Sequence, residues 1–367
     1  MTGQSISIAA TGASARGRKR KNIRSESGPP PTQAAKAQPT ARAERPRDLP
    51  AGWRVIAAKE FADHISSIRF LVLTLVLTLA AAAAVYSAAG GLRALAPSAS
   101  GANSLFLYLF FYQPEGSQLP TFVYFTALLG PVLGIAFGFD GVNGERAEGT
   151  LPRLVSQPIH RDDVVNGKFV AGLAAIAVIF IAVVAVVGAI GVLQLGILPG
   201  IEDVVRLVIW IGLAVVYVGL WLAVALLCSV VFRRAATSAL VSIAAWLVLT
   251  LFANLLVGVV AGVISPVSDD RNLQQLIANE STKRNLSFIS PSQLFTEATR
   301  ATLDPSLQTF DVFSYIQLRA DDRALPSTLS LDQSLLVVWP QLVGLIALTS
   351  GAFAVAYVSF MRQEVRA

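Results

Sequence analysis

The residues best placed to do chemistry in this chain form a charged insert, residues 145–168, between two long apolar runs. The insert carries Glu145, Glu148, Arg161 and Lys168, together with glycines and prolines that favour turns and short helices. Charges of both signs on a short structured segment are typical of a surface that docks onto another protein. We therefore predict a docking surface, with Glu145, Glu148 and Arg161 facing the cytosol.

Sequence patterns of catalysis are missing from the chain. It has no Gly-x-x-x-x-Gly-Lys-Ser/Thr phosphate loop, and its two histidines, His64 and His160, form no His-Glu-x-x-His pattern. Soft metal ligands are also scarce, since the chain has one cysteine, Cys228, and two methionines. We predict that the chain is not an enzyme and holds no cofactor and no metal.

The elements that position the insert are predicted from hydropathy. Of all residues 54% are hydrophobic and 14% charged, which is the composition of a polytopic membrane protein. Apolar runs close to or above the roughly 20 residues that cross a bilayer occur six times, at residues 68–89, 122–139, 169–193, 207–231, 235–264 and 335–360. Backbone amides in lipid must be paired within their own segment, so an all-α fold with six transmembrane helices is expected.

Lys and Arg residues predict the orientation of these spans, because cytoplasmic loops are enriched in them. Twelve precede the first span, and others gather in the insert, the turn 232–234 and the tail 361–367. The loops 90–121 and 194–206 contain one each, at Arg93 and Arg206. A protein of the cell membrane with both termini in the cytoplasm is therefore expected.

Two segments precede the first span. Residues 1–50 are basic and rich in proline and alanine, and we interpret them as a disordered cytoplasmic tail near anionic lipid; no nucleic-acid reader accompanies the charges. Residues 53–67 have apolar side chains at helical spacing, with Lys59, Glu60, Asp63 and His64 on the opposite face. This pattern predicts an amphipathic interfacial helix at the start of a membrane domain over residues 51–367.

The extracytoplasmic loop at residues 265–334 contains two short amphipathic segments, 269–286 and 292–303, bounded by prolines, which predict a small helical cap. It also holds two glycosylation triplets, at Asn279 and Asn285. In the spans, glycines recur every fourth residue and allow close helix approach, either within one subunit or at a dimer seam; they are Gly130, Gly134, Gly138, Gly258 and Gly262.

Several motifs carry a resemblance to a known family. In and beside the insert they are Asp140-Gly-Val-Asn-Gly-Glu145, Glu148-Gly-Thr-Leu151, Ser156-Gln-Pro-Ile-His-Arg161 and Gly167-Lys168. Outside it they are Lys59-Glu60-Phe61 and Phe360-Met-Arg-Gln-Glu364. Over residues 50–367 the chain resembles type-two ATP-binding-cassette (ABC) transporter permeases, nearest the branch associated with maturation of multi-copper enzymes such as nitrous-oxide reductase.

The resemblance implies a partner and a role for the insert. In that family two permease subunits pair with two separate ATPase subunits, which bind ATP and Mg, and the insert fits a cleft of the ATPase as a coupling helix. A short helix over residues 150–157 would do so here. The positions that match are Glu145, Glu148, Gly149, Thr150, Leu151, Pro158, Arg161, Gly167 and Lys168.

We therefore predict the membrane subunit of an exporter-like ABC transporter, a homodimer or a pair with a similar permease. One alternative is a mechanotransmitting membrane anchor for an ATPase that moves no solute. Another is an ion-coupled carrier, which the lack of charged residues inside the spans disfavours. Tyr217, Asn254 and Gln341 are the main larger polar side chains in the spans, where they either line a pathway for an amphiphilic cargo or bond neighbouring helices.

Overall fold

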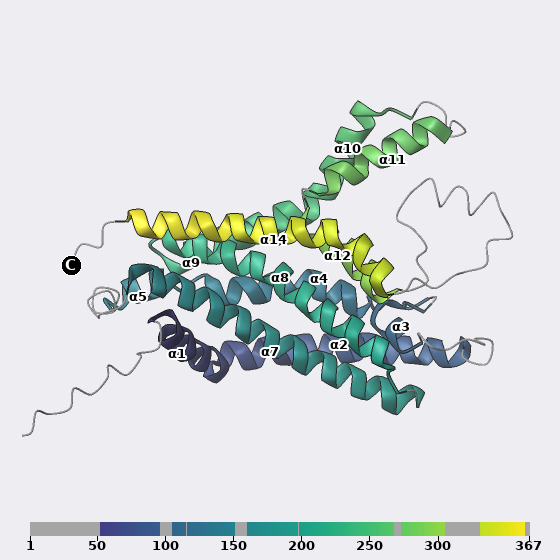
Figure 1. Ribbon diagram of the computed structural model, residues 1–367, viewed down its shortest axis with the longest axis horizontal. Helices are drawn as coiled ribbons and strands as arrows, with labels where there is room; N and C mark the ends of the chain where they lie inside the picture. The colour runs from purple at the N-terminus through teal and green to yellow at the C-terminus, as the bar shows by residue number, and fades with distance from the viewer. Residues whose placement is uncertain are drawn as a thin grey trace, which may run out of the picture. The chain divides into compact units, whose positions relative to one another are not determined.

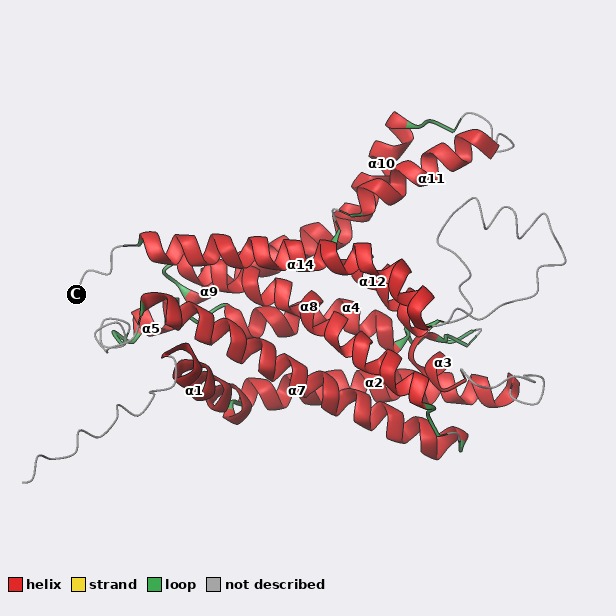
Figure 2. Ribbon diagram, viewed as in Figure 1, coloured by secondary structure: helices red, strands yellow, loops and turns green. Residues whose placement is uncertain are grey.

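The computed structural model describes residues 52–95, 105–114, 116–150, 160–196, 198–267, 273–288, 290–304 and 331–363. All regular structure in these ranges is helical (Figure 2), which confirms the all-α prediction. The predicted tail, residues 1–50, lies outside them.

Long helices run side by side in Figure 1, and shorter helices lie at their ends. The long helices are α2 (Ile68–Leu95), α4 (Phe122–Gly138), α7 (Arg161–Leu195), α8 (Ile201–Val231) and α14 (Leu331–Arg362). A broken segment contains α9 (Ala235–Leu247), the π-helix η3 (Val248–Phe252) and α10 (Ala253–Ile264). The remaining elements are α1 (Gly52–Ser66), α3 (Leu105–Phe111), α5 (Asn143–Ala147), α11 (Leu273–Ser287) and α12 (Pro291–Leu303).

Five of the six predicted spans are single segments long and apolar enough to cross a membrane. They are Ile68–Arg93, Phe122–Ala147, Arg161–Leu195, Ile201–Val231 and Ser334–Arg362. The predicted span at residues 235–264 passes only as a pair, Ala235–Thr250 and Leu255–Ile264, whose axes differ by 42°. A break therefore replaces the single long helix that the apolar run predicted.

Helix α8 lies at the centre of the bundle, against α4, α7, α12 and α14. Its large aromatic side chains, Trp210, Tyr217 and Trp221, are at most 1% exposed. The Tyr217 hydroxyl donates to the carbonyl oxygen of Ala127 at 2.8 Å, so the tyrosine bonds a neighbouring helix. Gln341 is also buried, and in the orientation that satisfies its amide it donates to carbonyls of its own helix.

Glycines on α4 explain the close approach of α4 and α8. A Cβ atom added at Gly134 would lie 2.4 Å from the carbonyl oxygen of Val218, and one at Gly138 would lie 2.8 Å from that of Leu222. These glycines therefore serve packing within the subunit, which was one of the two predicted uses. Cβ atoms at Gly258 and Gly262 would meet no other described atom within 4 Å.

The end of the bundle away from α1 is held together by Arg206, which is 1% exposed. Its guanidinium donates to Glu202 Oε1 at 2.8 Å, to the carbonyl oxygen of Thr302 at 3.0 Å and to Ser334 Oγ at 3.0 Å. These bonds join α8, α12 and the start of α14.

The two helices predicted between the fifth and sixth spans are present as α11 and α12. Helix α12 is more than a surface cap, because Phe295 is fully buried and stacks on Tyr217 at 4.4 Å between ring centroids. On α11, Asn279 is buried and donates to the carbonyl oxygens of Ala261 and Ser265, whereas Asn285 is exposed. Only the Asn285 triplet is thus accessible in the folded chain.

Candidate functional site: the stems of the insert

The insert is joined to the bundle by a segment at each end, and we call these two segments its stems. The first stem runs from the end of α4 through α5 and contacts α8. The Ser229 hydroxyl of α8 accepts hydrogen bonds from the backbone amides of Val142 and Asn143, at 2.9 and 3.1 Å. Gly149 then has a φ of 68°, in the left-handed region that glycine adopts without steric cost, and it follows the end of the helical segment. Thr150 donates through its hydroxyl to the carbonyl oxygen of Glu145, at 3.2 Å.

The second stem begins at α7, whose first residue is Arg161. Asp163 accepts a hydrogen bond from the backbone amide of His160 at 3.1 Å, and its charge suits the positive end of the helix dipole. The stems thus bracket residues 151–159, which lie outside the described residues. That range contains Leu151 and Pro158. It also contains all of the predicted short helix at residues 150–157 except Thr150.

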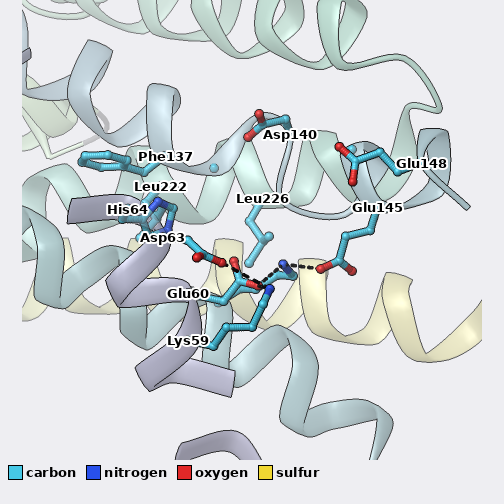
Figure 3. Close-up of a pocket in the computed structure, with 14 residues that line it drawn as sticks. Lys59, Glu60, Asp63, His64, Phe137, Asp140, Glu145, Glu148, Leu222 and Leu226 are labelled. Carbon is cyan, nitrogen blue, oxygen red and sulfur yellow. Dashed lines mark hydrogen bonds and ion pairs between the residues drawn. The ribbon is translucent and has the colours of Figure 1, made fainter. Parts of the chain in front are cut away.

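A buried ion cluster joins both stems to α1. Lys168 Nζ lies 2.9 Å from Glu60 Oε1 and 2.8 Å from Glu145 Oε1, while the three side chains are 7%, 13% and 15% exposed. Figure 3 shows Glu60 and Glu145 with the dashed contacts of the cluster between them. One buried ammonium therefore pairs with carboxylates from two different elements, and Lys59 Nζ, 3.3 Å from Glu60 Oε1, is a second and more exposed counter-ion.

The structure changes two expectations about side-chain direction. Glu145 was predicted to face the cytosol, but most of its surface is buried against Lys168, and its Oε2 accepts no hydrogen bond from any described residue. Arg161 was expected there too, but it is only partly exposed, because it contacts the end of α14. Glu148 is exposed, as expected.

Helix α1 also buries a different face from the one its hydropathy indicated. Val55 and Ile65 of the predicted apolar face are 54% and 40% exposed, whereas Ile56 is 7% exposed and Glu60 packs inward. The reason is local: Lys168 offers Glu60 a buried counter-ion, and Gly167 lets α1 approach. A Cβ atom at Gly167 would lie 2.7 Å from Ile56 Cγ2. The exposed apolar side chains remain available to lipid.

The ion cluster borders a cavity of about 340 Å³ between α1, α4, α5, α7 and α8. Burial alone would raise the pKa of the Glu60 carboxyl, but the adjacent Lys168 ammonium more than offsets it, and the pKa lies below its ordinary value. Because the folded-state pKa is lowered, Glu60 stabilises the fold above its unfolded pKa, and this stabilisation is lost as the pH falls through the folded value. Burial lowers the pKa of His64, which contacts Phe137 in the same cavity.

A second set of contacts binds the end of α14 to the stems. Arg146 donates to the carbonyl oxygen of Val230 at 3.1 Å and to the side-chain oxygen of Gln363, and Arg161 donates to the backbone oxygen of Gln363 at 2.9 Å. Sequence reasoning missed Ser229, since a single polar residue beside a long apolar run carries no spacing signal. Gln363 lies in the motif Phe360-Met-Arg-Gln-Glu364, but its contacts with the stems were not predicted. Glu60 was within reach, because it lies in a motif already noted on α1.

The stems are therefore tied to α1, α8 and the end of α14. The sequence matches the family described as ABC-2 family transporter protein over residues 54–365. The chain belongs to this family, whose members are multi-pass membrane permeases of ABC transporters. No curated protein gives a significant match.

Proposed function

We propose that this chain is the membrane subunit of an exporter-like ABC transporter, which couples ATP hydrolysis by a separate ATPase to movement of a substrate across the cell membrane. Family membership supports the permease class. The observation that carries the coupling role is the double attachment of the stems, through Lys168 to α1 and, just before the insert, through Ser229 of α8 to the backbone of Val142 and Asn143. A docking segment held this firmly would pass motion of the ATPase to the spans, with Glu145, Gly167 and Lys168 as its support and Glu148 and Thr150 at its surface.

The proposed topology has six crossings and both termini in the cytoplasm. Two observations support it. Helix α1 and Gln363 both contact the stems, so the two ends of the membrane domain lie on one side. Val230 at the end of α8 is on that side too, whereas Ser334 of α14 bonds Arg206 at the opposite end. These positions support a crossing between α8 and α14, which the broken segment from α9 to α10 would make.

Cysteine labelling tests this topology. In a Cys228→Ala background, cysteine replaces either of two exposed residues, Glu148 or Asn285. A membrane-impermeant maleimide should reach position 148 only from the cytoplasmic face and position 285 only from outside. Labelling of both positions from one side would contradict six crossings.

The partners proposed here are an ABC ATPase, which would bind ATP and Mg, and a second permease, either another copy of this chain or a similar one. Within the family, we propose the branch associated with maturation of multi-copper enzymes such as nitrous-oxide reductase. Within one subunit, the polar side chains Tyr217 and Gln341 are engaged in bonds to helix backbones. This observation favours an apolar or amphiphilic cargo over a small polar one, and it also keeps open the alternative of a mechanotransmitting anchor.

Reconstitution separates these two functions. The full chain is co-expressed with each ABC ATPase of the same genome, and the complex that co-purifies is placed in liposomes. ATP-dependent movement of a fluorescent amphiphile into or out of the vesicles is expected for an exporter. Chain-dependent hydrolysis without movement of amphiphiles would support the anchor, and the absence of any bound ATPase would contradict both.

A further inference from the structure

The amide side chain of Gln363 lies at the meeting point of three elements. Its Nε2 donates to the carbonyl oxygen of Val230 on α8 at 2.8 Å, and its Oε1 accepts from Arg146 of α5. Its backbone oxygen accepts from Arg161 of α7 at 2.9 Å. An amide suits this place chemically, because one side chain must donate to a carbonyl and accept from a guanidinium at once.

The two arginines belong to opposite stems of the insert. Arg146 precedes the segment 151–159 and Arg161 follows it, so both stems contact the same glutamine. The Arg161 guanidinium also lies over the Phe360 ring, 5.8 Å from its centroid, one helical turn before Gln363. We call Arg146, Arg161, Phe360 and Gln363 the C-terminal latch.

Helix α14 continues from the latch to the far end of the bundle. It packs along α8, and near its start Ser334 accepts a hydrogen bond from buried Arg206, which also bonds the carbonyl oxygen of Thr302 at the end of α12. Helix α14 is continuous from Leu331 to Arg362, with Pro340 inside it, and it packs directly on α12, so it links the latch to α12. Coupling between distant sites needs such a continuous element with two arrangements.

We propose that Gln363 is a positioning residue, which acts through Arg146 and Arg161 to transfer motion of the insert to the last span. This inference rests on the proposed function, in which an ATPase moves the insert. It also assigns a role to the motif Phe360-Met-Arg-Gln-Glu364, which the ion cluster around Lys168 leaves unused. The ATPase would dock elsewhere on the insert, so Gln363 would govern coupling and not binding.

The test uses the full chain with the co-purifying ATPase in liposomes. A spin label is attached to a cysteine at Leu336, whose side chain is 72% exposed near the start of α14, in a Cys228→Ala background. Its mobility spectrum is recorded with and without ATP, and ATP hydrolysis is measured in parallel. Gln363→Met removes both hydrogen bonds of the side chain at similar length. Gln341→Met, the same change on the same helix, is the matched control, since Gln341 bonds only its own helix.

In the Gln363→Met variant we expect the ATP-dependent spectral change and the chain-dependent stimulation of hydrolysis to fall by about tenfold, the order expected for loss of a charge-assisted hydrogen bond. The amount of co-purified ATPase should not change, and Gln341→Met should match the wild type. Gln363→Glu keeps an acceptor for Arg146 but loses the donor to the Val230 carbonyl, so it should restore only part of the response. Because the two residues act together, Arg146→Met combined with Gln363→Met should be no worse than either change alone.

Wild-type coupling in Gln363→Met would overturn the proposal. So would loss of membrane insertion or of ATPase binding in that variant, because the role of Gln363 would then be structural. If the wild-type chain itself binds no ATPase, the proposed function fails and this inference falls with it. That outcome is distinguishable, since it is seen before any residue is changed.

Discussion

Gly134→Ala should destabilise the protein, although alanine is the better helix former. The added Cβ would lie 2.4 Å from the Val218 carbonyl oxygen and 3.0 Å from the Leu222 amide nitrogen, both of which are backbone atoms of α8. The two helices must therefore separate along their whole contact. Overpacking of this kind costs roughly 1–3 kcal/mol in free energy of unfolding. Thermal unfolding of the purified protein in detergent measures the effect.

Gly212→Ala is the matched control. Gly212 lies in α8, and a Cβ there would meet no other described atom within 4 Å. This change should leave stability unaltered or raise it by up to about 1 kcal/mol, as expected for glycine to alanine in a helix. Equal unfolding temperatures for the two variants would contradict the close contact of α4 and α8. Loss of dimers without loss of stability in Gly134→Ala would instead place that glycine at a subunit seam.

Lys168→Met should be the most damaging single change in the ion cluster. It leaves the carboxylate of Glu145, which is 15% exposed, without its counter-ion, and that of Glu60, which is 13% exposed, with only the exposed Lys59 at 3.3 Å. Removal of one partner of a buried ion pair typically costs about 3–5 kcal/mol, because the remaining charge stays desolvated. We expect a lower unfolding temperature and easier proteolysis near α1.

A combined variant checks the cause. Lys168→Met together with Glu60→Gln and Glu145→Gln replaces the ions by neutral groups of similar shape and should recover most of the lost stability. A variant that stays as unstable as Lys168→Met alone would show that packing of the lysine stem, and not charge, is responsible. Recovered stability without recovered ATPase stimulation would identify the cluster as part of coupling.

Most of the membrane fold could be predicted, because a long apolar run in lipid can pair all its backbone amides within its own segment only as an α-helix. Five of the predicted spans are confirmed as unbroken helices that are long and apolar enough to cross a membrane. The break at η3 could not be predicted, since residues 246–253 contain neither proline nor glycine. A uniform apolar run carries no sequence signal for the position at which α-helical hydrogen bonding changes to π-helical hydrogen bonding.

The candidate site was predicted only in part. Local spacing identified Glu145, Gly149, Arg161 and Lys168 as members of one segment, but their partners lie far away in sequence. Glu60 was assigned to the solvent face of α1, because hydropathy treats a charge as exposed unless its counter-ion is known. Gln363 bonds residues more than two hundred positions earlier, and such pairings become visible only when the helices are packed.

The insert is proposed to couple this membrane domain to a separate ATPase. This coupling is tested most directly by replacing residues 150–159 with a glycine-serine linker of equal length and measuring ATPase co-purification and ATP hydrolysis in liposomes. The wild-type chain should retain an ABC ATPase and change its hydrolysis rate. The linker variant should insert in the membrane and do neither, whereas equal binding and hydrolysis in both would contradict the account.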